Sequence, residues 1–281
     1  MKNKKQLHAD RYLRWVCLNS TKRRYGDNDF YMERLETELK QIAELNLSNH
    51  FLVLKEMANL SRRKGYPVII KGKVEHLLVA YLLRISSVNP LRPHYHCNYC
   101  HYHRFRDEEE NGFDLPEQEC PICNMGRRPD GHDLCEDFLW NFPPFHMKVA
   151  PSVRYLLESR IYVKEKELGT EYPQPICLED SILCEMIGRM QKETGIRYGN
   201  VNPRDRLAGI YVYDEEHQRI FGDIDVDLEK YSFRELVRVG QMDPEQTIGT
   251  LIYKVKLEWY KQHYPNAYIK VMKEMGDVAR V

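Results

Sequence analysis

The sequence predicts an α+β fold, in which amphipathic helices surround short strands. Apolar residues recur at helical spacing in several segments, for example at Leu35, Leu39 and Ile42. Short apolar runs such as "YPVII" (66–70) have the length and the β-branched residues of a buried strand. A segment rich in cysteine and histidine, residues 92–135, interrupts this pattern and is interpreted as an inserted module.

Length and composition limit the class of protein. With 281 residues, the chain can form one large domain or two small ones. Hydrophobic residues make up 42% and charged residues 30%, which argues against disorder. The 42 lysines and arginines balance the 42 acidic residues, so any contact with nucleic acid must come from local patches.

The sequence shows no feature of a membrane or secreted protein. No apolar run approaches the ~20 residues that a membrane helix needs, and no apolar segment follows the basic start of the chain. We therefore expect a cytoplasmic protein without membrane contact. In that compartment its eight cysteines are expected to be thiols or metal ligands rather than disulfides.

The first part of the chain is predicted to be mostly helical. Residues 1–24 are basic and are interpreted as an N-terminal extension, either solvated or in contact with phosphate. Within this extension, "DRYLRWVC" predicts a short helix with Leu13 and Trp15 turned inward. Further helices are predicted at 31–45, at 50–64 with a stop at Gly65, and at 73–85.

The second part alternates helices and strands. Helices are predicted at 152–168, at 178–194 with a stop at Gly195, and from about 245 onward. Between them, residues 209–228 alternate in the manner of a two-stranded hairpin. We therefore divide the chain into the extension 1–24, a domain 25–150 that contains the module 92–135, and an α+β region 151–281.

Four cysteines of the module have the spacing of a zinc ribbon. Cys97-x2-Cys100 is followed after 19 residues by Cys120-x2-Cys123. Each pair forms a turn that aims two thiolates at one tetrahedral Zn²⁺. Four thiolates leave no open position for water, so we predict one structural zinc rather than a catalytic one. The neighbouring histidines could replace a cysteine as ligand, but surface positions or hydrogen bonds to the thiolates are the preferred interpretation; they are His94, His96, His101 and His103.

Three stretches resemble a known family. They are "YGDNDFYMERLETELKQI", "GYPVIIKGKVEHLLVAYLLRISSVNPLRPHYHCNYC" and "GFDLPEQECPICNMGRRPDGHDLCEDFL". They resemble, in the same order, the palm region of the PolC-type DNA polymerase III α subunit, a bacterial replicative polymerase, over about residues 25–140. The motifs "VNPLRPHY", "GFDLP" and "DGHD" flank the cysteine pairs as they do in that family, which carries a zinc module here. Weaker similarity to its fingers region follows in "EMIGRMQKETGI", "YSFRELVRVGQM" and "VKLEWYKQHYPNAYI".

The resemblance implies a polymerase-palm-derived mixed sheet with helices, a zinc-ribbon insertion and a helical C-terminal part. Residues 25–150 would then be palm-like and residues 151–281 fingers-like. It also implies DNA or replication proteins as partners. The family's exonuclease, PHP and OB modules have no room in this sequence, so we expect a condensed relative.

Two departures from the family predict that the chain is not catalytic. The family holds the incoming triphosphate in a Gly/Ser-rich loop. Here that loop is "IIKGKVEHL" (69–77), in which Lys71, Gly72 and Lys73 remain as a remnant and Glu75 would repel a triphosphate. The family also places an Asp-x-Asp pair for two Mg²⁺ ions after "DGHD", but no aspartate occurs from residue 138 to 178.

Three aspartates leave an active enzyme open as an alternative. Asp223, Asp225 and Asp227 alternate in "FGDIDVDLE" and therefore share one face of a predicted strand. They form a solvated edge, an acidic interaction surface, or a displaced Mg²⁺ site of a nucleotidyltransferase. The last reading requires them to lie close to Lys71 and Gly72. A further alternative is a zinc-ribbon module that binds only protein.

Basic residues near the module are candidate DNA contacts. Arg104, Arg106, Arg127 and Arg128 lie beside the cysteine pairs, and Arg62 and Arg63 end a predicted helix. Together they would form a phosphate-binding stripe. Basic residues at a helix C-terminus also have a purely electrostatic explanation. Lys254, Lys256 and Lys261 of the last helical segment are further candidates.

Overall fold

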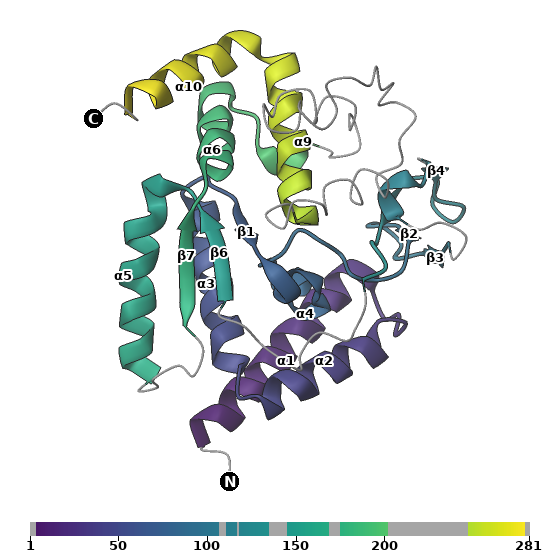
Figure 1. Ribbon diagram of the computed structural model, residues 1–281. Helices are drawn as coiled ribbons and strands as arrows, with labels where there is room; N and C mark the ends of the chain where they lie inside the picture. The colour runs from purple at the N-terminus through teal and green to yellow at the C-terminus, as the bar shows by residue number, and fades with distance from the viewer. Residues whose placement is uncertain are drawn as a thin grey trace, which may run out of the picture.

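The computed structural model describes residues 4–106, 111–116, 118–134, 145–168, 175–201 and 247–278. Three helices come first, α1 (Lys4–Tyr25), α2 (Met32–Glu44) and α3 (Ser48–Arg63). Helix α1 packs against α3 and α2, and α1 and α2 lie in the lower half of Figure 1. The predicted α+β class is confirmed, since the helices accompany two small sheets.

Helix α1 buries one face along its whole length. Ala9, Leu13, Cys17, Thr21 and Tyr25 are buried at every fourth position, which is the spacing of a single helical face. The helix therefore contributes to the core, whereas a solvated extension would bury none of these residues. The prediction that the neighbouring Trp15 also points inward is wrong, because its side chain is 61% exposed. Residues two positions apart in a helix point in directions that differ by ~200°, so Leu13 and Trp15 cannot share a face.

The larger sheet is mixed and has the order β1-β6-β7. Strand β1 (Val68–Ile70) runs antiparallel to β6 (Phe145–Val149), and β6 runs parallel to β7 (Ile176–Asp180). A parallel pair needs a crossover, which is helix α5 (Pro151–Leu168). Figure 1 shows α5 beside β7, on the side of the sheet away from α9. The helix predicted at 152–168 is confirmed.

Strands β6 and β7 were not predicted from the sequence. Strand β6 follows a proline-rich stretch, and β7 overlaps the helix that was predicted at 178–194. That helix, α6, begins at Ile182 because the Ser181 hydroxyl accepts a hydrogen bond from the Cys184 amide, as an N-cap does. Its predicted stop is confirmed, since Gly195 ends it with a φ of 71°.

The predicted helix at 73–85 is broken in two. A short 3-10 helix (Gly72–His76) is followed by Leu77 in an extended conformation and then by α4 (Leu78–Leu82). The break has a physical cause. The buried Glu38 carboxylate accepts hydrogen bonds from the amides of Leu78 and Val79, at 2.9 and 2.8 Å. These amides are therefore the start of a new helix rather than the middle of a long one.

The C-terminal helices α9 (Ile248–His263) and α10 (Pro265–Val278) pack on α6. The predicted helical C-terminal part is thus present in residues 247–278. The predicted hairpin at 209–228 and the segment "YSFRELVRVGQM" lie outside the described residues. In the part of the chain that the structure describes, no helix combines the length and the apolar character that a bilayer crossing demands.

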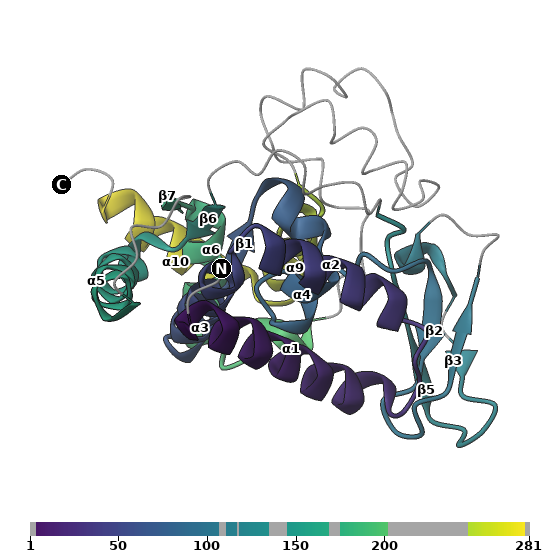
Figure 2. The ribbon, with the colours of Figure 1, turned by 90° about the horizontal axis from the view of Figure 1, so that it is seen from below.

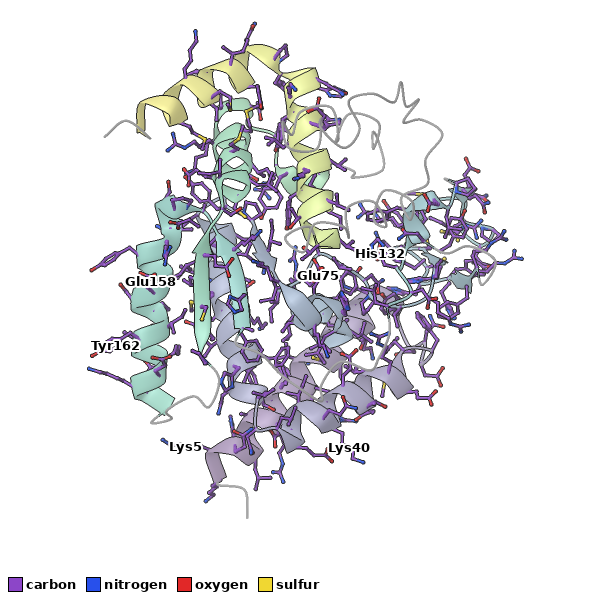
Figure 3. The ribbon with its side chains drawn as sticks, viewed as in Figure 1. Lys5, Lys40, Glu75, His132, Glu158 and Tyr162 are labelled. Carbon is purple, nitrogen blue, oxygen red and sulfur yellow. The ribbon has the colours of Figure 1, made fainter. Side chains whose placement is uncertain are left out.

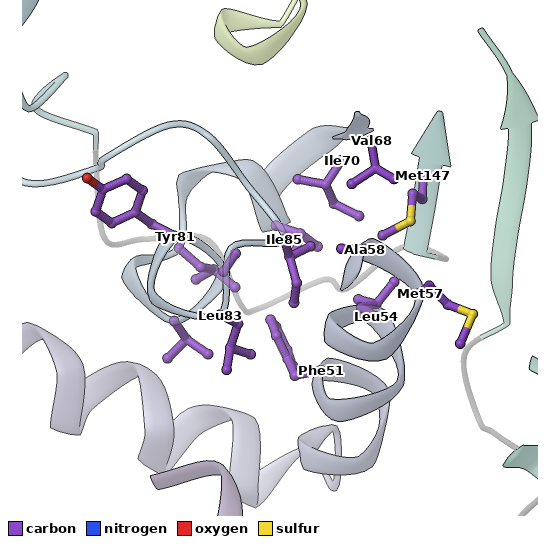
Figure 4. Close-up of a cluster of buried hydrophobic side chains, with 14 of the residues drawn as sticks. Phe51, Leu54, Met57, Ala58, Val68, Ile70, Tyr81, Leu83, Ile85 and Met147 are labelled. Carbon is purple, nitrogen blue, oxygen red and sulfur yellow. The ribbon is translucent and has the colours of Figure 1, made fainter. Parts of the chain in front are cut away.

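One hydrophobic core joins most of these elements. It includes residues from α1, α3, all three strands of the larger sheet and α6, such as Leu13, Phe51, Met147 and Ile187. Figure 4 shows part of it, where Phe51 and Leu54 of α3 face Ile85 and Leu83. This core crosses residue 150, so the division of the chain at that residue remains a prediction.

The smaller sheet lies apart from the larger one, at the right of Figure 1. Its order is β3-β2-β5-β4, and all neighbouring strands are antiparallel. Its strands are β2 (His94–His96), β3 (His103–Phe105), β4 (Gln118–Glu119) and β5 (Gly126–Asp130). In the view of Figure 2 this sheet stands at one end of α1.

Candidate metal centre and adjoining cationic pocket

The four cysteines of the smaller sheet converge on one point. The sulfur atoms of Cys97 and Cys123 are 3.5 Å apart, as are those of Cys100 and Cys120, and all four lie within 4.8 Å of one another. Tetrahedral Zn²⁺ with Zn–S bonds of about 2.3 Å would separate its sulfur ligands by about 3.8 Å. The donor set and its spacing therefore fit one zinc ion. Among the described residues, this is the group of metal-binding side chains close enough to share an ion.

Each cysteine pair lies in the same kind of turn. The Cys97 amide donates to the Tyr102 carbonyl at 2.8 Å, and the Cys120 amide donates to the Met125 carbonyl at 2.7 Å. In both turns the residue after the second cysteine is left-handed, with φ of 59° and 56°. The two turns are therefore structural equivalents, which is the arrangement that CxxC pairs adopt around a shared metal.

Backbone amides also point at the sulfur atoms. The amides of Ile122 and Cys123 donate to the sulfur of Cys120. Burial raises the pKa of the Cys120 thiol, but these donors and the neighbouring cysteines outweigh burial and lower its pKa to about 7. The pKa of Cys97 is also lowered, whereas backbone donors at Cys100 and Cys123 are outweighed by burial and the neighbouring sulfur atoms, which raise the pKa of both. Each turn therefore favours the thiolate, the form that binds metal, at its first cysteine.

The motifs that flank the cysteine pairs supply the contacts that attach this sheet to the rest of the fold. "VNPLRPHY" and "DGHD" lie side by side, since the His132 amide donates to the Asn89 carbonyl at 3.0 Å. Gly131 of "DGHD" has a φ of 96°, and a Cβ there would lie 2.4 Å from the Arg92 carbonyl oxygen. Gly112 of "GFDLP" donates its amide to the Gly131 carbonyl. Three separate motifs thus meet at one close-packed junction.

Asp130 lies at the centre of a polar network beside this junction. Its Oδ2 accepts from the Tyr81 hydroxyl at 2.7 Å and from the Asn89 amide at 2.8 Å. Arg24 of α1 donates to the same Tyr81 hydroxyl at 2.7 Å. Burial raises the pKa of Asp130, but nearby imidazoles outweigh burial and lower its pKa to about 2, namely those of His94, His96 and His132. Figure 3 shows His132 between the smaller sheet and α9.

A pocket of about 550 Å³ opens next to Asp130. Its lining combines residues from α1, α4, the smaller sheet, the turn at Gly199 and helix α9. Four cationic side chains and one carboxylate are among its lining residues, namely Arg24, Arg127, Arg128, Lys256 and Asp130. An excess of positive charge in a concave site attracts anions, and phosphate is the anion that such sites commonly bind.

Lys256 is held at the wall of this pocket by helix α9. Its Nζ donates to the Tyr198 carbonyl at 2.9 Å. Burial, and to a smaller extent the nearby charge of Arg128, lower the pKa of Lys256 to about 8. The buried ammonium of Lys256 lacks the solvation it would have in water. An anion bound in the pocket would supply its counter-charge, and the attraction would stabilise the bound anion.

The arginines of the predicted stripe lie on several elements of the fold, and a common phosphate-binding surface stays a prediction. Arg127 and Arg128 line the pocket, and the Arg127 guanidinium lies 4.6 Å above the Tyr95 ring. Arg104 is exposed on β3 and Arg106 follows it, half-buried. Arg62 and Arg63 end α3, where Arg62 donates to the Arg84 carbonyl at 2.5 Å and to Asn59 at 2.8 Å. Arg24 and Tyr81 were not singled out, because no local sequence pattern links α1 and α4 to the cysteine module.

The triphosphate-loop remnant forms contacts of its own. Lys71 Nζ lies 3.0 Å from Glu179 Oε2, and His146 Nδ1 lies 2.6 Å from Glu179 Oε1. Burial raises the pKa of Glu179, but these two partners outweigh burial and lower it. Gly72 is left-handed with a φ of 69°, and the next residue, Lys73, is exposed. The Lys71 charge is therefore neutralised from strand β7.

Glu75 of the same loop is buried against helix α9. Its side chain, labelled in Figure 3, accepts a hydrogen bond from the Gly249 amide at 2.7 Å and further bonds from Ile248 and from the Thr247 side chain. The carboxylate therefore caps the N-terminus of α9, where amides lack helical partners. Burial raises the pKa of Glu75 to about 7, although these donors oppose the shift.

Glu75 makes the stability of the fold depend on pH. Because its pKa is higher in the folded state than in the unfolded chain, the folded state binds the proton more tightly. The free energy of unfolding is therefore expected to fall by about 2 to 3 kcal/mol from pH 5 to pH 8 on account of this group. Urea unfolding across that range, compared between the wild type and Glu75→Gln, isolates the effect, with Glu36→Gln as an exposed control. Equal pH dependence in all three proteins would contradict it.

The three aspartates Asp223, Asp225 and Asp227 lie outside the described residues. Their distance from Lys71 and Gly72 therefore stays untested, and the displaced Mg²⁺ site remains an alternative.

The first half of the chain matches known proteins. The sequence model of the family "Bacterial DNA polymerase III alpha NTPase domain" matches residues 11–127. Similar proteins include the PolC-type DNA polymerase III of Oceanobacillus iheyensis, 36% identical over 130 residues, and that of Bacillus subtilis, 35% identical over 130 residues. Each match covers 45% of this chain and 9% of the relative.

A longer match extends slightly further. The PolC-type DNA polymerase III of Latilactobacillus sakei is 34% identical over 154 residues, which is 53% of this chain and 10% of that protein. The chain thus corresponds to about a tenth of the length of these relatives. The family match begins within α1, which the resemblance in the sequence had not included. The first half of this chain is therefore homologous to part of PolC-type DNA polymerase III.

Proposed function

We propose that this chain is a non-catalytic relative of PolC-type DNA polymerase III that keeps a zinc-stabilised scaffold and binds DNA beside the zinc site. The observation that carries the proposal is the composition of strand β6. It is the strand that follows the "DGHD" segment, where the family places its metal-binding aspartates. It also pairs with β1, which leads into the loop remnant at Lys71.

Strand β6 offers no carboxylate to a metal ion. Phe145, Met147 and Val149 point into the core, and the other face carries His146 and Lys148. Two Mg²⁺ ions need several oxygen ligands within a few ångströms, and apolar or cationic side chains supply none. This strand therefore cannot support the two-metal mechanism of nucleotidyl transfer.

The neighbouring strand does not replace the missing ligands. Its two carboxylates, Glu179 and Asp180, are consecutive and therefore point to opposite faces of the sheet. Glu179 is paired with Lys71 and His146, and Asp180 lies 3.1 Å from the Arg154 guanidinium. Neither is placed to share an ion with the other.

The charged side chains of the loop remnant likewise form contacts within the protein. Lys71 is neutralised by Glu179, and Glu75 fills the N-terminus of α9 with a carboxylate. A triphosphate at this loop would have to displace both and would meet the negative charge of Glu75. The site that would bind a nucleotide in the family therefore serves here to join the larger sheet to α9.

The cationic pocket supports the DNA-binding part of the proposal. Phosphate contacts through lysine and arginine supply most of the sequence-independent affinity for DNA. The zinc site would fix the position of Arg127 and Arg128, because β5 pairs with β2, which ends at His96, directly before Cys97. Zinc thus has a structural role in the proposal, and replication proteins are partners of the same scaffold.

Primer extension combined with DNA retardation tests the proposal. With Mg²⁺ or Mn²⁺ and all four dNTPs, we expect no extension of a primed template, and at low salt we expect that template to be retarded. The double variant Arg128→Ala/Lys256→Met should bind the template at least tenfold more weakly. The slope of the logarithm of its binding constant against the logarithm of the salt concentration should be smaller in magnitude by about 1.5 to 2. Lys40→Ala/Lys166→Ala removes the same number of charges from other surfaces and should bind like the wild type.

Two outcomes would overturn it. Extension that disappears in Asp225→Asn would establish an active enzyme with a displaced metal site. Absence of retardation at low salt, together with salt-insensitive binding to a protein partner, would establish a protein-interaction module instead.

A further inference from the structure

Helix α1 has a second face that the core does not use. The face opposite the buried residues carries aromatic and basic side chains that are exposed, namely Lys4, Lys5, His8, Arg11, Tyr12, Trp15 and Lys22. Several of these positions are three or four residues apart and therefore neighbours along one side of the helix. They form what we call the α1 platform.

The aromatic rings of the α1 platform are arranged as a ladder. The ring centroids of His8 and Tyr12 are 6.5 Å apart with an interplanar angle of 17°, and those of Tyr12 and Trp15 are 5.8 Å apart with an angle of 19°. Tyr12 is 44% exposed and Trp15 is 61% exposed. Large aromatic side chains are usually buried to a greater extent than this, so a parallel series of exposed rings calls for a ligand.

The charge around the rings is of one sign. Helix α1 contains a single acidic residue, Asp10, whose carboxylate accepts hydrogen bonds from Gln6 and Ser48. Ser48 starts α3, which packs on the buried side of α1, so Asp10 is directed toward the rest of the fold. Arg11 lies between the rings of His8 and Trp15 in the order of the helix, with further lysines at both ends. The platform thus offers flat apolar surfaces within a positive field.

We infer that the α1 platform binds the unpaired bases of single-stranded nucleic acid. Bases of a single strand expose their faces and stack on aromatic side chains, which contributes about 1–3 kcal/mol per base, while the basic residues contact the phosphates. A duplex hides its base faces within its own stack, so the platform should discriminate against it. The interspersed cations favour a polyanion over an apolar protein partner or a bilayer interior.

The inference rests on the proposed DNA-binding function but uses different residues. Arg24, which lines the cationic pocket, is nine residues after Trp15 and therefore lies ~180° away around the same helix. Variants of one site should consequently leave the other intact. DNA binding at the cationic pocket and single-strand binding at the α1 platform can therefore be tested separately.

Fluorescence titration with a dT20 oligonucleotide tests the platform. Stacking on a base quenches an exposed tryptophan, so we expect quenching in the wild type that is lost in Trp15→Phe. Trp15→Ala and Tyr12→Ala should each weaken dT20 binding by about tenfold, whereas Trp15→Phe should keep most of the affinity. Binding of a hairpin duplex should be unchanged in all three. Circular dichroism checks that the variants, which alter exposed side chains, stay folded.

A second exposed aromatic provides the matched control. Tyr162 on α5 is 57% exposed and has a lysine, Lys166, 4.3 Å above its ring. Tyr162→Ala should bind dT20 like the wild type. Unchanged dT20 affinity in Trp15→Ala and Tyr12→Ala would overturn the inference, even if Arg128→Ala/Lys256→Met showed that DNA binding at the pocket is real. Loss of affinity for anionic phospholipid vesicles in these variants, without loss of dT20 binding, would assign the platform to a membrane surface instead.

Discussion

Removal of the metal is expected to unfold the smaller sheet and to leave the main core folded. The four strands β2 to β5 are two to five residues long and enclose few apolar side chains, so the cysteine cluster has to hold them together. Structural zinc contributes about 10–16 kcal/mol of apparent binding free energy in small zinc domains, far more than such strands supply. Metal analysis should find about one zinc per chain.

Hydrogen exchange with and without a chelator measures this effect. The amides of Cys97 and Cys120, which are hydrogen-bonded within the two turns, should lose protection, while the amides of α3 should keep it. DNA binding at the pocket should weaken at the same time, because Arg127 and Arg128 lie on the affected strand β5.

Single cysteine variants supply the control for metal removal. Cys120→Ala should reproduce the effect of the chelator. Cys177→Ala, which removes a half-buried thiol on β7 outside the cluster, should keep its zinc. A metal-free preparation with fully protected amides in both turns would show that the cysteines do not hold a structural ion.

Truncation of Glu38 is expected to destabilise the protein by about 3–5 kcal/mol. Its carboxylate is 1% exposed, lies 2.9 Å from the Arg34 guanidinium and caps α4 through two amides. Arg34 in turn donates to the carbonyls of His76 and Leu134. Glu38→Ala would leave a buried cation and two buried amides without their acceptor, and each of these is costly in a low-dielectric interior.

A second glutamate of α2, whose ion pair is exposed, is the matched control. Glu36 also contacts an arginine, Arg14, at 2.5 Å, but its side chain is 42% exposed. Glu36→Ala should therefore change the free energy of unfolding by less than about 1 kcal/mol. Urea unfolding of both variants gives the comparison. If Glu38→Ala and Glu36→Ala lower the free energy of unfolding by the same amount, the pair of Arg34 and Glu38 is not the buried link between α2 and α4 that the structure shows.

Local sequence patterns predicted most of the helices and the metal site. Apolar residues at helical spacing located α2, α3, α5 and α6, and Ser181 and Gly195 explain the ends of α6. The spacing of the cysteines predicted the cluster because each pair lies within one turn, so its geometry depends on few residues. The motif resemblance likewise predicted a relation to PolC-type polymerases, which the comparisons confirm for the first half of the chain.

Strands β6 and β7 could not be predicted because they are short and depend on partners that are distant in sequence. The sequence "FHMKV" acquires its strand conformation by pairing with residues 68–70 and 176–180. The same holds for the break before α4, which is set by a carboxylate 40 residues earlier. The burial of Arg34 and Glu38 on α2 is likewise visible only in the packed structure, where Glu38 binds the first amides of α4.

The sequence by itself therefore predicted most of the helices and the clustering of the four cysteines, because each depends on residues close together in the chain. The tertiary structure alone decided that Glu75 caps α9, that Lys71 is neutralised by Glu179, and that Arg24 and Lys256 join Arg127 and Arg128 in one pocket. These contacts link segments up to 174 residues apart. Charge and burial at such sites are properties of the folded neighbourhood, and no local pattern encodes them.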